Sequence, residues 1–223
     1  GLYSISEERF ITEKEAESGI FKDIKKIKEK NYFFKMSAYQ QKLIEHIKQN
    51  PDFILPDYRK NEVLGFLNKP LNDLCISRPK SRLKWGIELP FDEDYVTYVW
   101  FDALINYISS IGYSNSNEKF RKFWPANIHL IGKDILTTHC VYWPTMLMSI
   151  GLDLPKTIFA HGWWLNKDSK MSKSVGNVIN PLDLIDEFDE DSLRFFLMRD
   201  MKLGQDSNFS EESFVARYNS DLA

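Results

Sequence analysis

The middle of the chain alternates between short apolar runs and longer segments with helical periodicity. Tyr95 to Phe101 is a run of β-branched and aromatic residues, and two shorter apolar runs cover Asn127 to Ile131 and Thr157 to Ala160. Runs of this length and composition predict buried strands. The segments between them, Asp102 to Ser110 and Ile135 to Ile150, have helical patterns. Strands that alternate with helices in this way predict a parallel α/β sheet.

The segment from Ile135 to Ile150 is apolar over most of its circumference, which predicts a buried helix. Pro144 falls inside it. Because proline has no backbone N–H and its ring clashes with the carbonyl four residues earlier, we expect a kink or a break near Val141. The preceding Gly132-Lys133-Asp134 is expected to form the turn between strand and helix.

Residues 31 to 70 predict a strand followed by two helices. The strand is expected from Asn31 to Met36, after which Ser37 should cap the first helix and Gln40 should complete a capping box. That helix should end before Pro51, and the second should follow Pro56. The expected core positions are Tyr39, Leu43, Ile44 and Ile47 in the first helix and Val63, Leu64 and Leu67 in the second.

Shorter elements are expected in the next stretch. Leu71 to Ser77 and Lys84 to Leu89 are expected to form strands around a polar turn from Arg78 to Arg82, and Asp92 to Asp94 an acidic turn. Near the chain end we expect three helices, over Leu182–Phe188, Asp191–Arg199 and Ser210–Ala223. The last of them has no C-cap signal, so we expect that the chain is cut there.

The first thirty residues are weakly patterned. A short strand is expected within the first ten residues, and Thr12 to Glu17 is expected to form one helical turn capped by Thr12. The lysine-rich segment from Lys22 to Lys30 is expected to be a solvated helix or loop. A patch that faces RNA is the alternative for this segment.

Composition favours a packed globular protein. The 223 residues are 43% hydrophobic and 14% aromatic, with a net charge of −3. The two cysteines, Cys75 and Cys140, are far apart and form no C-x-x-C pair, which indicates a reducing compartment. No apolar run approaches the roughly 18 residues of a membrane span, and no signal peptide pattern is present. Gly1 in place of methionine indicates a processed product or a chain that begins within a longer protein.

The loop from Lys170 to Pro181 combines features suited to a polyanion. Its first part, Lys170-Met171-Ser172-Lys173-Ser174, carries two ammonium groups and two hydroxyls. Such a loop can bring these groups, and backbone N–H groups, to one chain of phosphates. The alternative is a solvated basic turn that binds nothing. The full string, KMSKSVGNVINP, resembles the KMSKS signature loop of class I aminoacyl-tRNA synthetases in the form that methionyl enzymes carry.

A second string, HLIGKDILTTHCVYWP from His129 to Pro144, ends a predicted strand and opens a predicted helix. Ligands of open α/β sheets bind at the carboxyl ends of strands. Gly132 would allow close approach there and Asp134 would bind ribose hydroxyls, although an ordinary turn has the same composition. His139 and Trp143 share one helix face, where core packing is the alternative to ligand binding. The string resembles the ribose-binding turn and the methionine-pocket helix of methionyl enzymes.

Two more strings extend the resemblance. YVWFDALINY, from Tyr98 to Tyr107, resembles a segment of the bacterial methionyl enzymes. Ile76-Ser77-Arg78 with Lys84-Trp85-Gly86 resembles the family's ISR…KWG hairpin, which implies that Arg78 approaches the active site; a surface turn is the alternative for Arg78. A thioether packs favourably against aromatic rings. The resemblance implies a methionine pocket lined by Trp100, Ala103, Leu104, Tyr107, Ile135, His139 and Trp143.

The resemblance covers residue 31 to the chain end and implies a cytoplasmic methionine–tRNA ligase of bacterial or organellar type. The implied activity is ATP-dependent formation of methionyl-adenylate from L-methionine, then transfer to the 3′ end of tRNA(Met) for protein biosynthesis. The implied catalytic groups are Lys173 and, secondarily, Lys170. Gly132, Asp134, Lys170, Ser172 and Lys173 would bind ATP, with Mg²⁺ as the accompanying ion. Neither a membrane nor a DNA partner is expected.

The implied fold is α/β. Residues 1–97 would be part of a connective insertion with α+β structure, and residues 98–162 the second half of a Rossmann-like, nucleotide-binding parallel sheet. Residues 163–223 would hold the KMSKS loop, a helical segment that contacts the tRNA stem, and the start of the anticodon-binding helical bundle.

Two family features are missing from the sequence. No histidine is followed two positions later by glycine, so the HIGH motif is absent. We therefore expect the HIGH-containing half of the nucleotide-binding fold to precede Gly1, and this chain alone to be inactive. The stretch Tyr3-Ser4-Ile5-Ser6-Glu7 stands where many relatives have the Tyr-Cys-x-x-Cys string of a zinc knuckle, and it has no cysteine.

Two other functions stay open on the sequence alone. Another class I synthetase, for leucine, isoleucine, valine or cysteine, would share the nucleotide-binding strings, whereas the set Trp100, Tyr107, His139 and Trp143 favours methionine. A non-catalytic binding module that has kept the fold would also fit a chain without the HIGH motif. A reading frame upstream of Gly1 that encodes the motif would exclude that module.

We predict that the chain binds no stoichiometric zinc. Zinc knuckles need thiolate or imidazole ligands, and Ser4 and Glu7 stand at the positions where the relatives have cysteine. Elemental analysis of protein purified without chelators should find only traces of zinc. A content near one zinc ion per chain would contradict the prediction.

Overall fold

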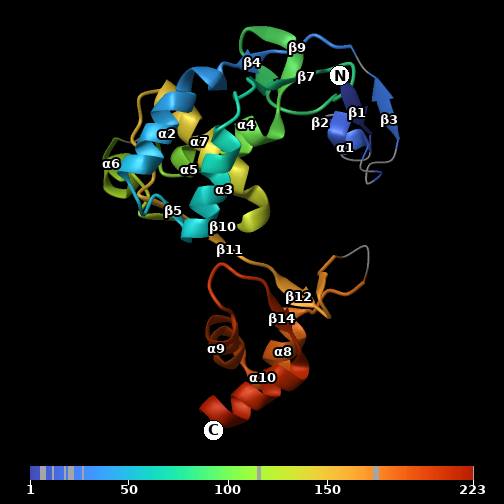
Figure 1. Ribbon diagram of the computed structural model, residues 1–223, viewed down its shortest axis with the longest axis vertical. Coiled ribbons are helices and arrows are strands. Elements are labelled where there is room, and N and C mark those ends of the chain that lie inside the picture. Colours follow the sequence, from blue (N-terminus) through green and yellow to red (C-terminus); the bar gives the residue numbers. More distant parts are fainter. Residues whose placement is uncertain are drawn as a thin grey trace. The chain divides into compact units, whose positions relative to one another are not determined.

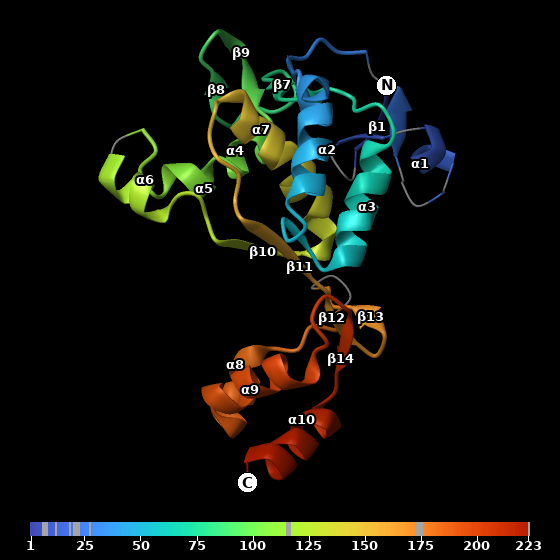
Figure 2. The same cartoon turned by 60° about the vertical axis from the view of Figure 1, so that its left-hand side comes forward.

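The computed structural model describes residues 1–5, 9–11, 13–17, 19, 23–26, 28–114, 117–172 and 176–222. The chain forms two compact units: unit 1 is Gly1–Phe34 with Cys75–Phe101, and unit 2 is Lys35–Leu74 with Asp102–Ala223 (Figures 1 and 2). This division differs from the expected boundary at residue 97, because Lys35–Leu74 cluster with the second unit. Within the described ranges, no helix is both long and apolar enough to cross a membrane.

The first sheet of unit 1 is antiparallel and has the order β2-β1-β3. It consists of β1 (Leu2–Ser4), β2 (Arg9–Ile11) and β3 (Ile24–Lys26), and α1 (Glu13–Glu17) follows β2. The expected solvated helix or loop over the lysine-rich segment is therefore wrong for residues 24–26, which pair with β1. Sheet pairing with a distant strand overrides the local lysine pattern. Thr12, the expected cap of α1, lies outside the described residues.

The second sheet of unit 1 has the order β7-β9-β8, with β7 (Ser77–Pro79), β9 (Asp92–Thr97) and β8 (Glu88–Leu89) antiparallel. The expected strand Leu71–Ser77 reaches this sheet only through Ser77, since its residues 74–75 form β6 (Leu74–Cys75), which pairs with β4 (Phe33–Phe34). The expected strand Lys84–Leu89 is present only as β8, which pairs with β9. Arg78 lies in β7 and not in a turn, and the expected acidic turn at Asp92 is the start of β9. The two short strands β4 and β6 lie where the chain passes between the units.

The expected single strand from Tyr95 to Phe101 is wrong in length and in partner. Strand β9 ends at Thr97, and α4 (Val99–Ala103) begins almost at once. The N–H of Phe101 donates to the carbonyl of Tyr98, which closes a turn that the apolar run does not reveal. The expected helix over residues 102–110 is also divided, into α4 and α5 (Asn106–Ser109).

The predicted parallel sheet is confirmed in unit 2. It has the order β10-β11-β5, with β10 (Ile128–Gly132), β11 (Thr157–His161) and β5 (Ile54–Leu55) all parallel (Figure 1). The strand β5 was not predicted, because two residues between helices carry no strand pattern. The segment around it therefore belongs to this sheet and not to unit 1.

The two predicted helices next to β5 are present as α2 (Gln40–Gln49), preceded by the 3₁₀ turn η1 (Met36–Tyr39), and α3 (Asp57–Leu67). The expected capping box is wrong. Ser37 Oγ donates to Asp73 Oδ1 at 2.6 Å, and Gln40 Nε2 donates to the carbonyl of Leu67 at 2.7 Å. Both side chains thus bind the end of α3 and the segment after it. They do not cap the start of the first helix, which is what the local pattern predicts.

The predicted break before Pro144 is confirmed. The helical segment consists of the 3₁₀ turn η2 (Lys133–Ile135), the π-helical turn η3 (Thr138–Tyr142) and α7 (Trp143–Ser149). The π turn widens the helix where proline prevents regular hydrogen bonding. A further helix, α6 (Asn117–Phe123), precedes β10.

The C-terminal part of unit 2 forms its own small core. The predicted helices are present as α8 (Pro181–Phe188), α9 (Glu190–Asp200) and α10 (Glu211–Arg217), followed by the π turn η4 (Tyr218–Leu222). Ser210 caps α10 as expected, accepting from the N–H of Ser213. A sheet that was not predicted lies beside them, with β12 (Trp164–Asn166), β13 (Ser169–Lys170) and β14 (Ser207–Phe209). The buried core residues are Leu184, Leu193, Phe196, Phe209 and Phe214.

His129 is a buried residue of strand β10 in the parallel sheet. Trp143 Nε1 donates to His129 Nε2 at 3.2 Å, and the ring centroid of Tyr107 lies 4.2 Å from the imidazole. Burial, with a smaller contribution from nearby His139, lowers the pKa of His129 to about 4. The imidazole is therefore neutral at pH 7, as its role as acceptor requires.

We predict that the free energy of unfolding falls as the pH drops from about 6.5 toward about 4. The unfolded chain takes up a proton near the ordinary histidine pKa, whereas the folded chain resists it, so acid favours unfolding. Linkage makes the loss about 3 kcal/mol between pH 7 and pH 4. Urea denaturation of wild-type chain and of His129→Gln, which keeps an acceptor but does not titrate, measures it.

The Gln variant should lose most of this pH dependence. The control is His46→Gln, because His46 is only partly buried and its pKa is lowered by that burial alone. It should remove a smaller part of the dependence. Identical pH profiles for wild-type chain and His129→Gln would contradict the prediction.

Candidate active site

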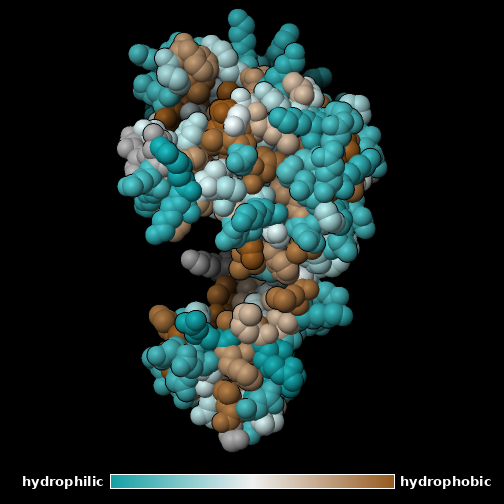
Figure 3. Space-filling model, turned by 90° about the vertical axis from the view of Figure 1, so that its left-hand side faces the viewer, coloured by the Kyte–Doolittle hydropathy of each residue, from teal (hydrophilic) through white to brown (hydrophobic). Residues whose placement is uncertain are grey.

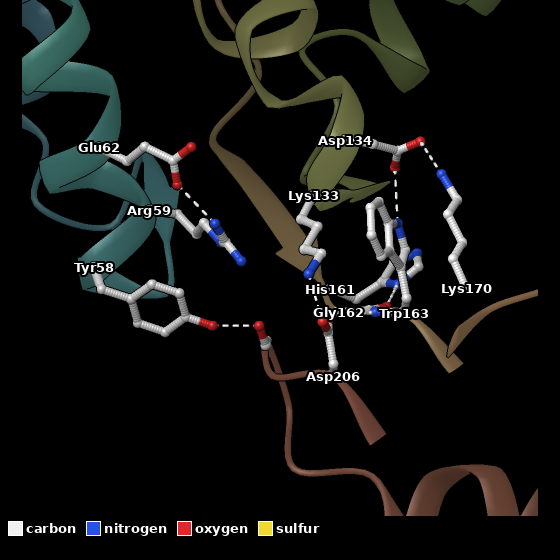
Figure 4. Close-up of polar contacts among 11 residues, drawn as sticks. Tyr58, Arg59, Glu62, Lys133, Asp134, His161, Gly162, Trp163, Lys170 and Asp206 are labelled. Atoms are coloured by element: carbon white, nitrogen blue, oxygen red, sulfur yellow. Dashed lines mark hydrogen bonds and ion pairs between the residues drawn. The ribbon is translucent and has the colours of Figure 1, made fainter. Parts of the chain in front are cut away.

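The carboxyl ends of β10 and β11 lie side by side in unit 2. Their register pairs Gly132 with His161, so the turn to Asp134 and the segment from Gly162 to Trp163 leave the sheet at one edge (Figure 4). Open α/β folds bind ligands at this edge. A Cβ atom on Gly132 would lie 2.6 Å from Asp134 Oδ1, so a glycine is needed for the carboxylate to sit over the strand end.

The carboxylate of Asp134 meets the first lysine of the 170–181 loop. Lys170 Nζ lies 3.8 Å from Asp134 Oδ2, and Trp163 Nε1 donates to Asp134 Oδ1 at 3.3 Å (Figure 4). The structure therefore brings together two of the predicted nucleotide contacts. One is a carboxylate suited to hydroxyl donors and the other an ammonium suited to phosphate.

Three residues around this pair were not predicted from the sequence. Lys133 Nζ donates to Asp206 Oδ2 at 2.5 Å, and the backbone N–H of Trp163 donates to Asp206 Oδ1 at 2.9 Å. The bond from Lys133 and then the bond from Trp163 lower the pKa of Asp206, which is therefore ionised at neutral pH. Trp163 follows a predicted strand and could have been found from that position. Asp206 has no such signal, because it reaches the site from a distant turn.

Two close contacts join this edge to the segment that carries Asp206. A Cβ atom on Gly162 would lie 2.0 Å from the carbonyl oxygen of Gln205, so no side chain fits there. The hydroxyl of Tyr58, in the first turn of α3, donates to the carbonyl of Gly204 (Figure 4). The position of Asp206 is thereby fixed by backbone as well as by side chains.

The 170–181 loop is fastened by Asn177. Its Oδ1 accepts from the N–H of Ser172 at 2.8 Å, and its Nδ2 donates to the carbonyl of Lys170 at 3.1 Å. Asn166 Nδ2 donates to the carbonyl of Asn177 at 2.9 Å. Lys173, the main predicted catalytic residue, lies outside the described residues. Asn177 was quoted within the loop string but had no assigned role, and the structure shows that it holds Lys170 and Ser172 in place.

Tyr107, His139 and Trp143, three of the residues assigned to the methionine pocket, lie close together in the structure. The carbonyl of Ile135 only accepts, so His139 donates to it from Nδ1 at 3.0 Å, which leaves Nε2 to accept from the Tyr107 hydroxyl at 2.9 Å. Burial lowers the pKa of His139, and the imidazole is therefore neutral at pH 7. The ring centroids of Tyr107 and Trp143 lie 5.9 Å apart. His129 joins this aromatic group, although no role was predicted for it.

The predicted pocket residues of unit 2 differ in how far their side chains are exposed to solvent. Trp143 and Leu104 are 0% and 1% exposed, whereas Tyr107 is 36% exposed. Ala103 is exposed and contributes to a separate hollow of about 390 Å³, lined also by Asp102, Ile105, Asn106 and Ser109. Of these residues, Tyr107 is therefore the aromatic residue whose ring is exposed.

Trp100 and Arg78 belong to unit 1, with Trp100 in α4 and Arg78 in β7. Arg78 is 7% exposed, so a surface turn is excluded for it. Its Nη1 donates to the carbonyl of Ser77 at 2.7 Å, and its guanidinium lies 4.4 Å from the ring centroid of Tyr98. Across the part of the chain that the structure describes, no three His, Cys, Asp or Glu side chains are grouped to hold a metal ion.

Comparison with known proteins gives consistent matches over the whole chain. The family profile described as "tRNA synthetases class I (M)" matches residues 10–223. The chain is 49% identical to the methionine–tRNA ligase of Clostridium perfringens (strain 13 / Type A), over 100% of this chain and 35% of the relative. It is 47% identical to the methionine–tRNA ligase of Rickettsia conorii (strain ATCC VR-613 / Malish 7), over 100% of this chain and 44% of that relative.

A solved structure shares the fold. The crystal structure of Mycobacterium tuberculosis methionyl-tRNA synthetase bound by methionyl-adenylate matches with a TM-score of 0.90 and 45% identity, over 100% of this chain and 45% of that one. The chain spans 35% to 45% of the length of these relatives. Because the family profile matches nearly every residue of it, the chain belongs to the class I (M) tRNA synthetases.

Proposed function

We propose that this chain is part of a methionine–tRNA ligase that activates L-methionine with ATP and transfers it to tRNA(Met). The observation that carries the proposal is the meeting of Asp134 and Lys170, whose charged groups lie 3.8 Å apart at the carboxyl edge of the parallel sheet. A site for ATP needs acceptors for ribose hydroxyls beside cations for phosphates. The similarity to the structure whose title names bound methionyl-adenylate supports this assignment.

In the proposed first step the methionine carboxylate attacks the α-phosphorus of ATP. A bond forms between the carboxylate oxygen and that phosphorus, the bond to the β-phosphate oxygen breaks, and pyrophosphate leaves with the electron pair. Such phosphoryl chemistry depends on positioning and charge stabilisation. Asp134, beside Gly132, would hold the ribose, while Lys173 and secondarily Lys170 neutralise the charge on pyrophosphate and Ser172 contributes a hydroxyl. Mg²⁺ would arrive with the nucleotide, bound to its phosphates.

Methionine is the amino acid that the aromatic group favours. A thioether packs well against the edges of aromatic rings. Three rings lie together here, those of Tyr107, His139 and Trp143, and the imidazole of His139 is neutral. Because Trp143 and Leu104 are fully packed, the side chain would enter beside Tyr107 and displace part of this packing. Ile135, Ala103 and, from unit 1, Trp100 and Arg78 remain proposed contacts. A synthetase for another amino acid is the second candidate, and the names of the relatives favour methionine.

The second proposed step uses tRNA(Met). A hydroxyl of its 3′-terminal ribose attacks the methionyl carbonyl, and AMP leaves. The bond between the methionyl carbonyl carbon and the phosphate oxygen breaks, and the proton of the attacking hydroxyl passes to the phosphate of the departing AMP. The helices α8, α9 and α10 would contact the tRNA stem, and a cytoplasmic location is part of the same proposal.

We predict that Lys173→Ala lowers the rate of ATP–pyrophosphate exchange roughly 10²–10³-fold in the longer protein that carries the upstream half. Lys170→Ala should lower it less. A cation that meets charge only in the transition state changes kcat more than KM, so the KM for methionine should stay within about twofold. The control is Lys167→Ala, an exposed lysine just before the loop. A loss of less than about threefold for Lys173→Ala would contradict its catalytic role.

We predict that Tyr107→Phe raises the KM for methionine about tenfold and leaves the KM for ATP unchanged. Removal of the hydroxyl removes its hydrogen bond to His139 Nε2, which costs about 0.5–1.5 kcal/mol and loosens the ring group. Tyr113→Phe is the matched control, since the ring of Tyr113 packs on the ring of Phe120. Equal changes in both KM values would show that Tyr107 has no specific role toward methionine.

A further inference from the structure

One aromatic side chain links the charged residues of the candidate nucleotide site. Lys133 Nζ lies 4.1 Å and Lys170 Nζ 4.0 Å from the ring centroid of Trp163, and Figure 4 shows the indole between the two lysines. An ammonium group at this distance is attracted to the negative face of the ring. The edge of the same ring donates from Nε1 to Asp134 at 3.3 Å. Trp163 therefore contacts three charged side chains, each of them at or beside the carboxyl edge of the sheet.

The two lysines are held with different strength. The Lys133 side chain is 19% exposed and its Nζ lies 2.5 Å from Asp206, whereas the Lys170 side chain is 55% exposed and its Nζ lies 3.8 Å from Asp134. A long ion pair in contact with water contributes little. Asp206 also accepts from the backbone N–H of Trp163. Short hydrogen bonds thus fix the positions of Lys133, Asp206 and Trp163 relative to one another. Lys170 is held more weakly and is the side chain that can move away.

The two oxygens of Asp134 differ in the same way. Oδ1 accepts the Trp163 N–H, which fixes the orientation of the carboxylate. Oδ2 lies 3.8 Å from Nζ of the more exposed Lys170. A hydroxyl donor that approaches from the open side would therefore bond to Oδ2 and take the place of the ammonium group, which then becomes available to an anion.

We propose that Trp163 is a positioning residue of the nucleotide site. Its N–H presents Asp134 Oδ2 to the ribose hydroxyls, and its ring holds Lys170 until the ribose displaces that lysine toward the phosphates. The inference rests on the proposed function, because it requires that Asp134 receives the ribose. It couples recognition of one end of the nucleotide to release of the cation for the other end.

The test is a titration of the ¹⁵N-labelled 223-residue chain, followed by NMR at its six tryptophan indole N–H groups. Trp163→Phe and Trp164→Phe identify two of these signals, and the titrants are adenosine and 2′,3′-dideoxyadenosine. The ratio of the two dissociation constants isolates the contribution of the ribose hydroxyls. In wild-type chain adenosine should bind about tenfold more tightly, as expected for charge-assisted hydrogen bonds, and should shift the Trp163 signal.

Trp163→Phe keeps an aromatic face but has no N–H, so the preference for adenosine should fall about fivefold. Trp164→Phe is the matched control, because the ring of Trp164 packs against Phe196 and Phe209 in the C-terminal core. It should leave the preference unchanged. A purely structural role for Trp163 would weaken both nucleosides equally and leave their ratio unchanged, and that result would overturn the inference while the proposed function stands. A wild-type chain with no preference for adenosine would overturn both.

The release of Lys170 has its own measurement. Pyrophosphate should bind wild-type chain about threefold more tightly when adenosine is saturating. Adenosine carries no charge of its own, so the gain would come from the Lys170 ammonium group that its ribose displaces from Asp134. Trp163→Leu, which lacks the ring that holds Lys170, should show no such gain. Equal affinity for pyrophosphate with and without adenosine in wild-type chain would overturn this part of the inference.

Discussion

Parallel pairing of β10 with β11 is the constraint on which the candidate site depends. It places Gly132 level with His161, so the residues that follow both strands leave the sheet at one edge. The short strand β5 extends the pairing and brings the first turn of α3, with Tyr58, to the same edge. The contacts of Asp134 with Trp163 and Lys170 that Figure 4 shows follow from this arrangement. Without parallel register, Asp134 and Trp163 would lie at opposite ends of their strands.

Two environments with opposite electrostatics lie next to each other in unit 2. The imidazole rings of His129 and His139 are buried and neutral. Each accepts a hydrogen bond at Nε2, His129 from Trp143 and His139 from Tyr107, which requires the unprotonated nitrogen. At the sheet edge, Lys133, Lys170 and two carboxylates remain partly exposed and charged. An apolar side chain suits the first environment and a polyanion the second. The proposed substrates, methionine and ATP, divide in the same way.

The features that could be predicted from the sequence are those encoded by continuous stretches of residues. The family, the parallel sheet and the break before Pro144 all follow from such stretches. The sequence could not predict Asp206, whose contacts come from a distant turn, or strand β5, whose two residues pair only because β11 lies beside them. The prediction of one strand from Tyr95 to Phe101 was wrong, because a short apolar run does not by itself distinguish a strand from the start of a helix, and α4 begins at Val99.

The π turn η3 has a consequence for chain length. A π turn holds one residue more than a regular helical turn, so it acts as a single-residue insertion between the glycine turn and α7. Loss of one residue there would restore regular winding and preserve α7, yet it would rotate His139 relative to Trp143 and present a different side chain to Tyr107. In this segment a change of length therefore changes which side chains surround Tyr107, even where every residue on either side is kept.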